Sequence, residues 1–368
     1  MRNREMARIA GVVLVAATLT ALPSGTAQAT SHLKATPIAS GLAFPAGFTF
    51  APNGTIFYGE RLTGRIRIFN PANSSNRVFF RISNVVTSGE QGLLGVALHP
   101  NYPTTPYVYA SVVRSVSGVP RNQIVRIRNS GGTGSGMTVI YNGGGRSNTH
   151  HVGGRILFGP DGMLYLVVGD KGVPSNAQNL GKLAGKVLRM LPSGGVPSDN
   201  PFSSRVYAYG IRNSFGLAFD PSTDDLWETE NGPGCNDETN PIIPGGNYAW
   251  GPSATCSTPP SPPANTNQDG PNRIMPATFY SPSPRLPALT GIVFCDTCGL
   301  GAASEGHAFM GAWNHGNIRE LTLDSTRTDV TSDVVAYVHN SGVLSLERAP
   351  NGAIYFSDAD QIFKLELA

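Results

Sequence analysis

The chain has 368 residues, of which 14% are charged, and its formal net charge is +3 at pH 7. So small and scattered a charge excludes a solvated acidic or basic tail, and we expect no nucleic-acid partner. The 44 glycines and 29 prolines predict many turns, and no apolar stretch beyond the N-terminal 30 residues is long enough to span a membrane.

The N-terminal residues have the features of a cleaved export signal. Three arginines precede an apolar core from Ile9 to Leu22, and residues 26–29 (Thr-Ala-Gln-Ala) offer a cleavage site. The apolar core is shorter than a comfortable membrane span, and an anchored N-terminal helix is the alternative. We expect residues 1–29 to be a signal peptide and the mature protein to be secreted or periplasmic.

The four cysteines are Cys235, Cys256, Cys295 and Cys298. An even count in an exported chain indicates disulfides, and we expect Cys235 to pair with Cys256 and Cys295 with Cys298. A redox-active C-x-x-C is the alternative for the second pair, but the glycines after Cys298 make a poor helix start. A zinc site is a weaker alternative, because it would need a second C-x-x-C pair.

A unit made of an apolar strand, a turn with a proline and an aromatic-rich strand recurs along the chain. The turn prolines are Pro52, Pro100, Pro160, Pro221 and Pro350. The last interval is about twice the others, and residues 291–294 with 305–313 fill the missing copy. Six such units of four strands predict an all-β fold, a six-bladed β-propeller with long inter-strand loops over residues 30–368. A sandwich or a barrel does not explain a sixfold repeat.

The third unit carries the most distinctive polar residues. His151 precedes a predicted hairpin with strands at 156–158 and 164–168, and Asp170 follows it. A hairpin returns the chain to its starting edge, so we expect His151 to lie beside Asp170. A carboxylate next to an imidazole fixes its tautomer and raises its basicity, as a general base requires. Two idle loop histidines and a turn aspartate are the alternative.

Polar residues also precede the inner strands of the two neighbouring units. Glu90 and Gln91 precede the second hairpin, and Arg212 and Asn213 precede the fourth. The loops at one end of the inner strands share one face of a propeller. Three consecutive units therefore predict one polar site on a common rim.

Taken together, these segments resemble the glucose/sorbosone dehydrogenase family, which includes the soluble quinoprotein glucose dehydrogenases and the aldose sugar dehydrogenases. The resemblance covers most of the mature chain. The matching segments are His151-x-x-Gly154-Arg155 with the hairpin to Asp170, Tyr209 to Phe219 with Arg212-Asn213, and the loop segments Asn231-Gly232-Pro233, Asn236-Asp237-Glu238 and Gly245 to Trp250.

The resemblance implies a sugar (aldose) dehydrogenase that holds pyrroloquinoline quinone (PQQ) and passes electrons to an external acceptor. His151 would take the proton of the anomeric hydroxyl as hydride passes to the quinone, and Asp170 would orient His151. Arg212 would stabilise negative charge on the quinone oxygen, and Asn213 would shape that pocket. The residues expected to contact the sugar are Glu90, Gln91 and His150.

The resemblance also implies calcium. Gly232 and Pro233 would offer backbone carbonyls to a calcium ion that bridges to the cofactor. Glu238 and Tyr248 match positions that hold a structural calcium, an ion that prefers a shell of oxygen ligands. Glu238 bracing its loop without metal is the alternative.

The sequence departs from the family pattern at two places. Glu90 stands where the family commonly has a glutamine. The family holds the quinone's carboxylates with Lys and Arg of the last two units, whereas here no lysine lies between Val187 and Phe363, and Leu344 and Glu347 occupy the Arg-x-x-Arg positions. The alternative function is therefore a non-redox calcium propeller that binds carbohydrate or a protein partner. A calcium-dependent hydrolase is a third, supported by fold analogy alone.

Overall fold

The computed structural model describes residues 32–144, 148–254, 256, 269–281 and 285–368. The expected signal peptide lies outside these residues. Within them, helix is limited to α1 (Ser175–Gln178) and the 3-10 helix η1 (Ala302–Ser304). No helix in this described part of the chain has the length and apolar character needed to cross a membrane.

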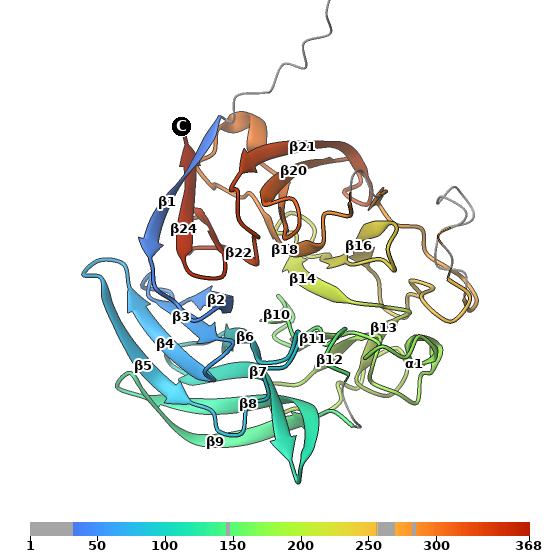
Figure 1. Cartoon of the computed structure of the whole chain (residues 1–368), viewed down its shortest axis with the longest axis horizontal. Helices are drawn as coiled ribbons and strands as arrows, with labels where there is room; N and C mark the ends of the chain where they lie inside the picture. Colours follow the sequence, from blue (N-terminus) through green and yellow to red (C-terminus); the bar gives the residue numbers. More distant parts are fainter. Residues whose placement is uncertain (1–31, 145–147, 255, 257–268, 282–284) are drawn as a thin grey trace, which may run out of the picture. The chain divides into compact units, whose positions relative to one another are not determined.

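The strands form six four-stranded antiparallel sheets, which are the blades of a β-propeller (Figure 1). The first blade contains β2 (Pro45–Phe50), β3 (Ile56–Glu60), β4 (Arg65–Asn70) and β5 (Ser75–Arg81), and the second contains β6 (Leu93–Leu98), β7 (Tyr107–Val116), β8 (Val119–Ser130) and β9 (Thr133–Asn142). The third contains β10 (Ile156–Phe158), β11 (Leu164–Val168), β12 (Lys186–Met190) and β13 (Val206–Tyr209). The fourth contains β14 (Ser214–Phe219), β15 (Leu226–Glu230), β16 (Asp237–Ile242) and β17 (Thr278–Tyr280). The fifth contains β18 (Leu289–Phe294), β19 (Ala308–Ala312), β20 (Asn317–Leu323) and β21 (Val330–Val338), and the sixth contains β22 (Ser345–Arg348), β23 (Ile354–Ser357), β24 (Ile362–Leu367) and β1 (Leu33–Ala39). The predicted fold class is confirmed.

The sixth blade joins the two ends of the described chain. β1 pairs antiparallel with β24, in a register that places Leu33 opposite Leu367 and Ala35 opposite Leu365. The first described strand therefore completes the last blade, so the ring is closed by main-chain hydrogen bonds. This pairing removes the open sheet edge that β24 would otherwise expose.

The innermost strands are the apolar strands of the predicted repeats. β2, β6, β10, β14, β18 and β22 lie nearest the central axis in Figure 1. In the fifth blade the proline turn is replaced by a longer connection that contains the Cys295–Cys298 disulfide. The second disulfide joins Cys235 to Cys256, so both pairs are those expected from the sequence. The degenerate repeat is therefore a real blade with a different turn.

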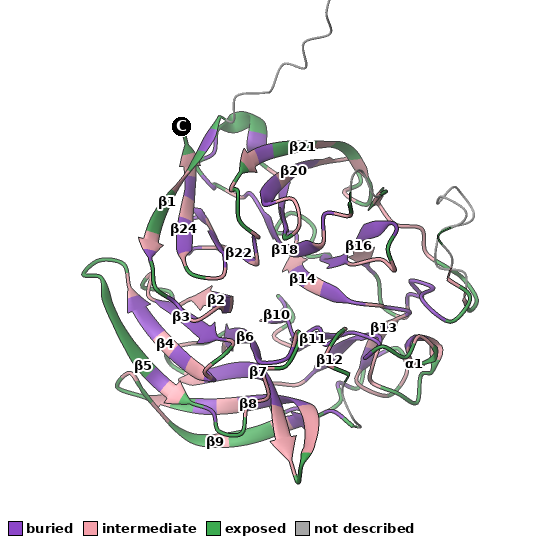
Figure 2. Cartoon of the chain, in the orientation of Figure 1, coloured by how far each residue is buried: buried purple, intermediate pink, exposed green. Residues whose placement is uncertain are grey.

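The core lies between neighbouring blades, because side chains alternate between the two faces of each strand. On β8, Ile124 packs with Tyr109 toward the third blade, whereas Val125 and Ile127 pack with Ile66 toward the first. Figure 2 shows the consequence, with buried residues on the inner and middle strands and exposed residues along β5 and β9. The inner ends of six tightly packed sheets thus form a rigid rim.

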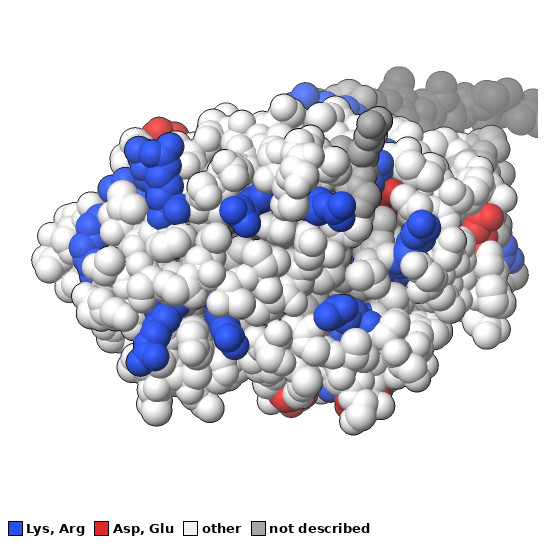
Figure 3. All heavy atoms as spheres, turned by 90° about the horizontal axis from the view of Figure 1, so that it is seen from below, with Lys and Arg blue, Asp and Glu red and all other residues white. Residues whose placement is uncertain are grey.

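The charge is less evenly distributed than the net value suggests. Residues 45–142, which form the first two blades, contain nine arginines and two glutamates but no lysine or aspartate. Figure 3 views the molecule from below Figure 1, the side on which β5 and β9 lie, and its basic side chains stand apart with uncharged surface between them. Positive charge is therefore concentrated in two blades, but on this side it is dispersed.

Candidate functional site

The third blade brings His151 and Asp170 together as the sequence predicted. The hairpin of β10 and β11 pairs Ile156 with Leu166, and the Gly154 N–H donates to the Val167 carbonyl, which extends the ladder toward His151. A Cβ on Gly153 would lie 2.5 Å from the Val167 carbonyl oxygen, so this close approach requires glycine. The His151 Nδ1 and an Asp170 oxygen are 2.7 Å apart.

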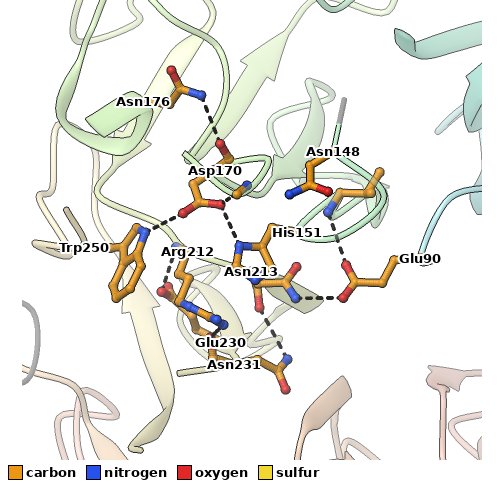
Figure 4. Close-up of polar contacts among 12 residues, drawn as sticks. Glu90, Asn148, His151, Asp170, Asn176, Arg212, Asn213, Glu230, Asn231 and Trp250 are labelled. Carbon is orange, nitrogen blue, oxygen red and sulfur yellow. Dashed lines mark hydrogen bonds and ion pairs between the residues drawn. The ribbon is translucent and has the colours of Figure 1, made fainter. Parts of the chain in front are cut away.

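Asp170 is fully buried and accepts three hydrogen bonds through its carboxylate. Its Oδ1 accepts from His151 Nδ1 and from the Gly172 N–H at 2.6 Å, and its Oδ2 accepts from the Trp250 indole Nε1 at 2.7 Å (Figure 4). A carboxylate only accepts, so the proton of a neutral His151 is on Nδ1 and the Nε2 lone pair is available to take a proton. This arrangement suits a general base.

Trp250 is a member of the site that sequence patterns did not identify. It lies in the connection between β16 and β17 of the fourth blade, 80 residues after Asp170, and its indole is buried. A tryptophan in an apolar segment normally indicates core packing, and no local pattern distinguishes one whose N–H has a carboxylate partner. The one clue to such a residue is that a buried Asp170 needs hydrogen-bond donors in addition to His151.

Arg212 lies beside this pair in the fourth blade. Its backbone N–H donates to Glu230 Oε1 at 2.8 Å, its Nη1 donates to the Asn231 carbonyl at 2.7 Å, and its guanidinium lies 5.3 Å from the Trp250 ring centroid. Burial lowers the pKa of Arg212, while the carboxylates of Asp170 and Glu230 act in the opposite direction. Its buried Nε has no hydrogen-bond partner among the described residues. Arg212 is thus a fixed cation whose buried Nε–H is available to a ligand.

Glu90 and Asn213 connect the second and fourth blades across the site. The Asn213 Nδ2 lies 3.4 Å from Glu90 Oε1, and the Val152 N–H lies 3.4 Å from Glu90 Oε2. The buried Asn213 Oδ1 has no partner in the described part of the chain. Figure 4 shows these contacts with those of His151. Three neighbouring blades therefore bring their polar residues to one rim, as the repeat predicted.

A cavity of about 420 Å³ opens beside these residues at the inner ends of the blades. Its walls are mostly apolar, with charged or amide groups at a few positions. The residues that line it are Phe44, Ala46, Arg61, Gly89, Glu90, Leu94, Gly153, Arg155, Asn213, Phe215, Asn231, Ala288, Leu289, Thr290, Trp313 and Leu344. His151 and Arg212 are not in this lining, but Gly153, two residues after His151, and Asn213, next to Arg212, are. The site is therefore a small apolar well with a polar side.

The sequence model of one protein family, described as Glucose / Sorbosone dehydrogenase, matches residues 42–364. The chain belongs to the glucose/sorbosone dehydrogenase family. Quinoprotein glucose dehydrogenase B of Acinetobacter calcoaceticus is 34% identical over 58% of this chain, and the match spans 51% of that enzyme.

Two solved structures are similar over nearly their whole length. A putative oxidoreductase (glucose dehydrogenase) of Thermus thermophilus is 32% identical with a TM-score of 0.78, and covers 90% of this chain and 99% of its own. The PQQ-bound form of aldose sugar dehydrogenase from Streptomyces coelicolor is 27% identical with a TM-score of 0.77, and covers 91% of this chain and 98% of its own.

In this member of the glucose/sorbosone dehydrogenase family, the cations of the cavity come from the first and third blades. Arg61 Nη1 donates to the carbonyls of Gly89 and Gln91 at 2.6 and 2.9 Å. Arg155 Nη1 lies 3.4 Å from Glu347, a rim carboxylate. Burial lowers the pKa of Arg155 and raises the pKa of Glu347 to about 7. Arg61 was not identified from the sequence, because no pattern marks the residue after β3 as facing the axis.

The fifth and sixth blades supply no cation to the cavity among the described residues. They line it with Ala288, Leu289, Thr290, Trp313 and Leu344. The arginines of the last two blades each pair with an aspartate elsewhere, in the ion pairs Arg319–Asp333, Arg327–Asp220 and Arg348–Asp296. The lack of a cationic contribution from the last two units, noted in the sequence, is therefore also a feature of the structure.

Two of the expected sugar contacts lie outside the cavity lining. The Gln91 side chain is buried, and its Nε2 donates to the Asn148 carbonyl at 3.2 Å. His150 is exposed, with its Nδ1 3.0 Å from the Thr149 hydroxyl. Glu90 lines the cavity. Of the three residues, only Glu90 is placed where a ligand in the cavity would meet it directly.

The expected calcium residues lie in and after the loop between β15 and β16. The Gly232 N–H donates to Asp237 Oδ1 at 2.9 Å, and Gly232 and Pro233 are half-buried. Glu238 is buried opposite Glu230 in the ladder, and burial raises its pKa to about 8. The Tyr248 hydroxyl donates to the Pro241 carbonyl and accepts from the Ile243 N–H, so any ligand from Tyr248 would be its backbone carbonyl.

Glu228 and Glu230 are two further buried carboxylates that the sequence analysis did not single out. They alternate along β15 with Trp227 and Thr229, so both lie on the face of the fourth blade that also carries Glu238. Burial raises the pKa of Glu228 to about 7 and raises that of Glu230 strongly. The available signal was the alternation of two glutamates with Trp227 and Thr229 in a predicted strand. Three buried carboxylates on one face need protons or a cation.

Proposed function

We propose that the chain is an exported, PQQ- and calcium-dependent aldose dehydrogenase in which His151 is the general base. The observation that carries this proposal is the buried Asp170 carboxylate, which accepts from both His151 and Trp250 beside the cavity. The family membership and the PQQ-bound relative support the same chemistry.

The residues around the cavity fit a planar, anionic, aromatic group. Leu94, Phe215, Leu289 and Trp313 offer apolar surface of the kind that flat rings contact. The polar side of the cavity offers the buried Nε of Arg61 and the buried Oδ1 of Asn213, which have no hydrogen-bond partner among the described residues. The Nε of Arg212, the residue before Asn213, is likewise buried and has no partner there. Charged guanidinium donors without partners are costly unless a ligand satisfies them. When bound, the quinone would supply the hydride acceptor.

The chain's own residues would perform the remaining work. The Nε2 of His151 would accept the proton of the sugar's anomeric hydroxyl, and the Asp170 carboxylate would stabilise the imidazolium that results. Arg212 would face developing negative charge with a donor that needs no reorganisation. The Glu90 oxygens would accept hydrogen bonds from sugar hydroxyls, and the apolar walls would exclude water. Gln91 and His150 would act at the edge of this site rather than inside it.

Calcium fits the donor chemistry of the loop that follows β15. Among the described residues, three metal-binding side chains come close together only at Cys295, Cys298 and Glu305, where the cysteines form a disulfide. A calcium ion near the cavity would therefore depend on backbone carbonyls, such as those of Gly232 and Pro233. A structural ion would be bound by oxygens of Glu238 and Tyr248, and its positive charge would offset the negative charge of the buried carboxylates.

Export is the proposed location, either to the periplasm or outside the cell. Two disulfides that account for all four cysteines suit an oxidising compartment. The N-terminal segment with its basic start and apolar core supports the same location. The proposed partners are an aldose and an external electron acceptor.

The proposal is tested by mixing the purified protein with PQQ, calcium, an aldose and a dye acceptor. The wild-type protein should reduce the dye. His151→Ala should abolish reduction because the base is lost, while His150→Ala, altered at the neighbouring exposed imidazole, should keep most of kcat. Absence of dye reduction by the wild-type protein with quinone bound would contradict the proposal.

The second candidate is a non-redox propeller of the same family that binds carbohydrate or a protein partner. The observation that favours it is the absence, among the described residues, of a cation from the fifth and sixth blades in the cavity lining. It predicts binding to glycans or a protein without quinone. A glycan array probed with and without PQQ separates the two functions.

A further inference from the structure

Lys186 is a fully buried lysine on β12 whose ammonium, within the described part of the chain, donates hydrogen bonds to backbone carbonyls alone. Its Nζ donates to the carbonyl oxygens of Asn176, Ala177 and Ala184 at 2.8, 2.9 and 2.8 Å. Buried lysines are rare and normally pair with a carboxylate. Here the three donors of the ammonium are matched by three acceptors, so the group is satisfied without an ion pair.

The three carbonyls belong to the segment that connects Asp170 to β12. This segment contains only the four-residue helix α1, whose N-cap makes no side-chain hydrogen bond. A helix this short has no stability of its own, and most of its carbonyls lack partners within it. The ammonium of Lys186 therefore holds this segment in place through its three hydrogen bonds to the segment's carbonyls.

The residues that Lys186 holds are also those that hold the site. The Asn176 Nδ2 donates to the Asp170 carbonyl at 3.0 Å, and the Gly210 N–H donates to the Ala177 carbonyl at 3.1 Å, two residues before Arg212. The adjacent Gln178 donates to the Trp250 carbonyl at 2.9 Å. Asp170, Arg212 and Trp250 come from separate parts of the chain, and all three are tied to α1.

We propose that Lys186 is a positioning residue, an internal cation that fixes α1 and through it the Asp170 carboxylate, the Trp250 indole and Arg212. The side chain does not line the cavity, so it acts through α1 rather than on a ligand. Its effect on turnover rests on the proposed function, whereas its effect on the geometry does not.

The charge of Lys186 is part of this role. Burial lowers its pKa to about 7, and the three carbonyl oxygens favour the charged form because the ammonium donates to all three, whereas a neutral amine has only two N–H donors. Replacing Lys186 by Met removes the cost of burying a charge but takes one donor from each of three carbonyls, of which those of Asn176 and Ala177 keep a single backbone N–H donor. These two effects on the free energy of unfolding oppose each other, so we expect its net change to be small. The position of α1 should nevertheless change, because the hydrogen bonds from Lys186 that hold it are lost.

The indole N–H of Trp250 reports this geometry directly, because it donates to Asp170 Oδ2. The protein has three tryptophans, so a spectrum of the ¹⁵N-labelled indoles is simple, and Trp250→Phe assigns the signal. In Lys186→Met the Trp250 indole signal should move or broaden and its proton should exchange about ten times faster or more. The signal of Trp227, buried elsewhere in the fourth blade, should stay unchanged.

Lys182→Gln is the matched control, because Lys182 lies in the same segment but is exposed. It should leave both indole signals at their wild-type positions, and Lys186→Arg should partly restore the Trp250 signal. If Lys186→Met fails to fold, Lys186→Gln, which keeps an amide donor, decides the question. A folded Lys186 variant with a wild-type Trp250 signal and exchange rate would overturn the proposal.

Turnover provides the second readout. With quinone and calcium bound, the folded Lys186 variant should lose about ten- to a hundredfold in kcat with little change in KM, as expected for a misplaced base. If the wild-type protein itself shows no quinone-dependent turnover, the proposed function fails. The indole measurement still decides the role of Lys186.

Discussion

Replacing Asp170 by Asn tests the hydrogen-bond arrangement behind His151 with the smallest change of shape. Asp170 accepts two N–H groups at Oδ1 and one at Oδ2. An amide has one oxygen and one NH₂ group. With its oxygen at the Oδ1 position, the NH₂ faces the Trp250 N–H, and in the flipped orientation it faces the Gly172 N–H. Either orientation therefore leaves a buried donor facing another donor.

The size of the effect follows from these contacts. One unsatisfied buried donor costs about 1–3 kcal/mol, and the remaining bonds lose their charge assistance, so the free energy of unfolding should fall by about 2–4 kcal/mol. In the flipped orientation the amide N–H pushes the His151 proton to Nε2, which removes the base. Because a general base contributes about 10²–10⁴ in rate, kcat should fall by a factor in that range.

The assay pairs urea unfolding with dye reduction, and the chain offers a matched control. Asp358 in the sixth blade accepts from His339 Nε2 at 3.0 Å and from two backbone N–H groups, outside the cavity lining. Asp358→Asn should lose a similar amount of stability but keep kcat within about twofold, since distant sites act independently. A folded Asp170→Asn protein with wild-type kcat would refute the reasoning, as would an equal loss of kcat in Asp358→Asn.

Three further predictions follow from burial, covalent links and the metal. Burial lowers the pKa of Lys171 from 10.5 to about 8, with Arg121 adding to the shift, so the ammonium destabilises the fold below pH 8 and this cost disappears as pH rises to about 10.5. At pH 7 the free energy of unfolding of Lys171→Met should therefore exceed that of the wild type by at most about 3 kcal/mol, and above pH 10.5 the two should be equal. Urea titrations at several pH values measure this difference. Removing the Cys235–Cys256 disulfide, which spans 21 residues, should cost about 3 kcal/mol in the same assay, and an unchanged midpoint would contradict this. Chelating calcium should lower the Tm of the wild type but not that of Glu238→Gln, and equal shifts in both would place the ion elsewhere.

The sequence predicts the blades well because their signal is local. The apolar inner strand, the proline turn and the aromatic strand recur within about 15 residues, and a hairpin necessarily returns Asp170 to His151. The six copies and their order then fix the rim on which Glu90, His151 and Asn213 meet. This part of the site follows from period and turn chemistry alone.

The residues that complete the site are joined by contacts between distant segments. Trp250 reaches Asp170 from the connection between β16 and β17 of the fourth blade, and Arg61 reaches the cavity from the end of β3. Lys186 looks like one residue of an alternating strand, and only its three carbonyl partners distinguish it. β1 pairs with β24 at the other end of the described chain, and no local pattern encodes that pairing.

The most direct test of the proposed cofactor chemistry is a calorimetric titration of PQQ into the protein with calcium and with a chelator. The account predicts saturable one-to-one binding that requires calcium and is retained in His151→Ala, because that residue acts on the proton and does not hold the quinone. Absence of binding by the calcium-loaded wild-type protein would contradict the account, and would leave the cavity to a ligand of another kind.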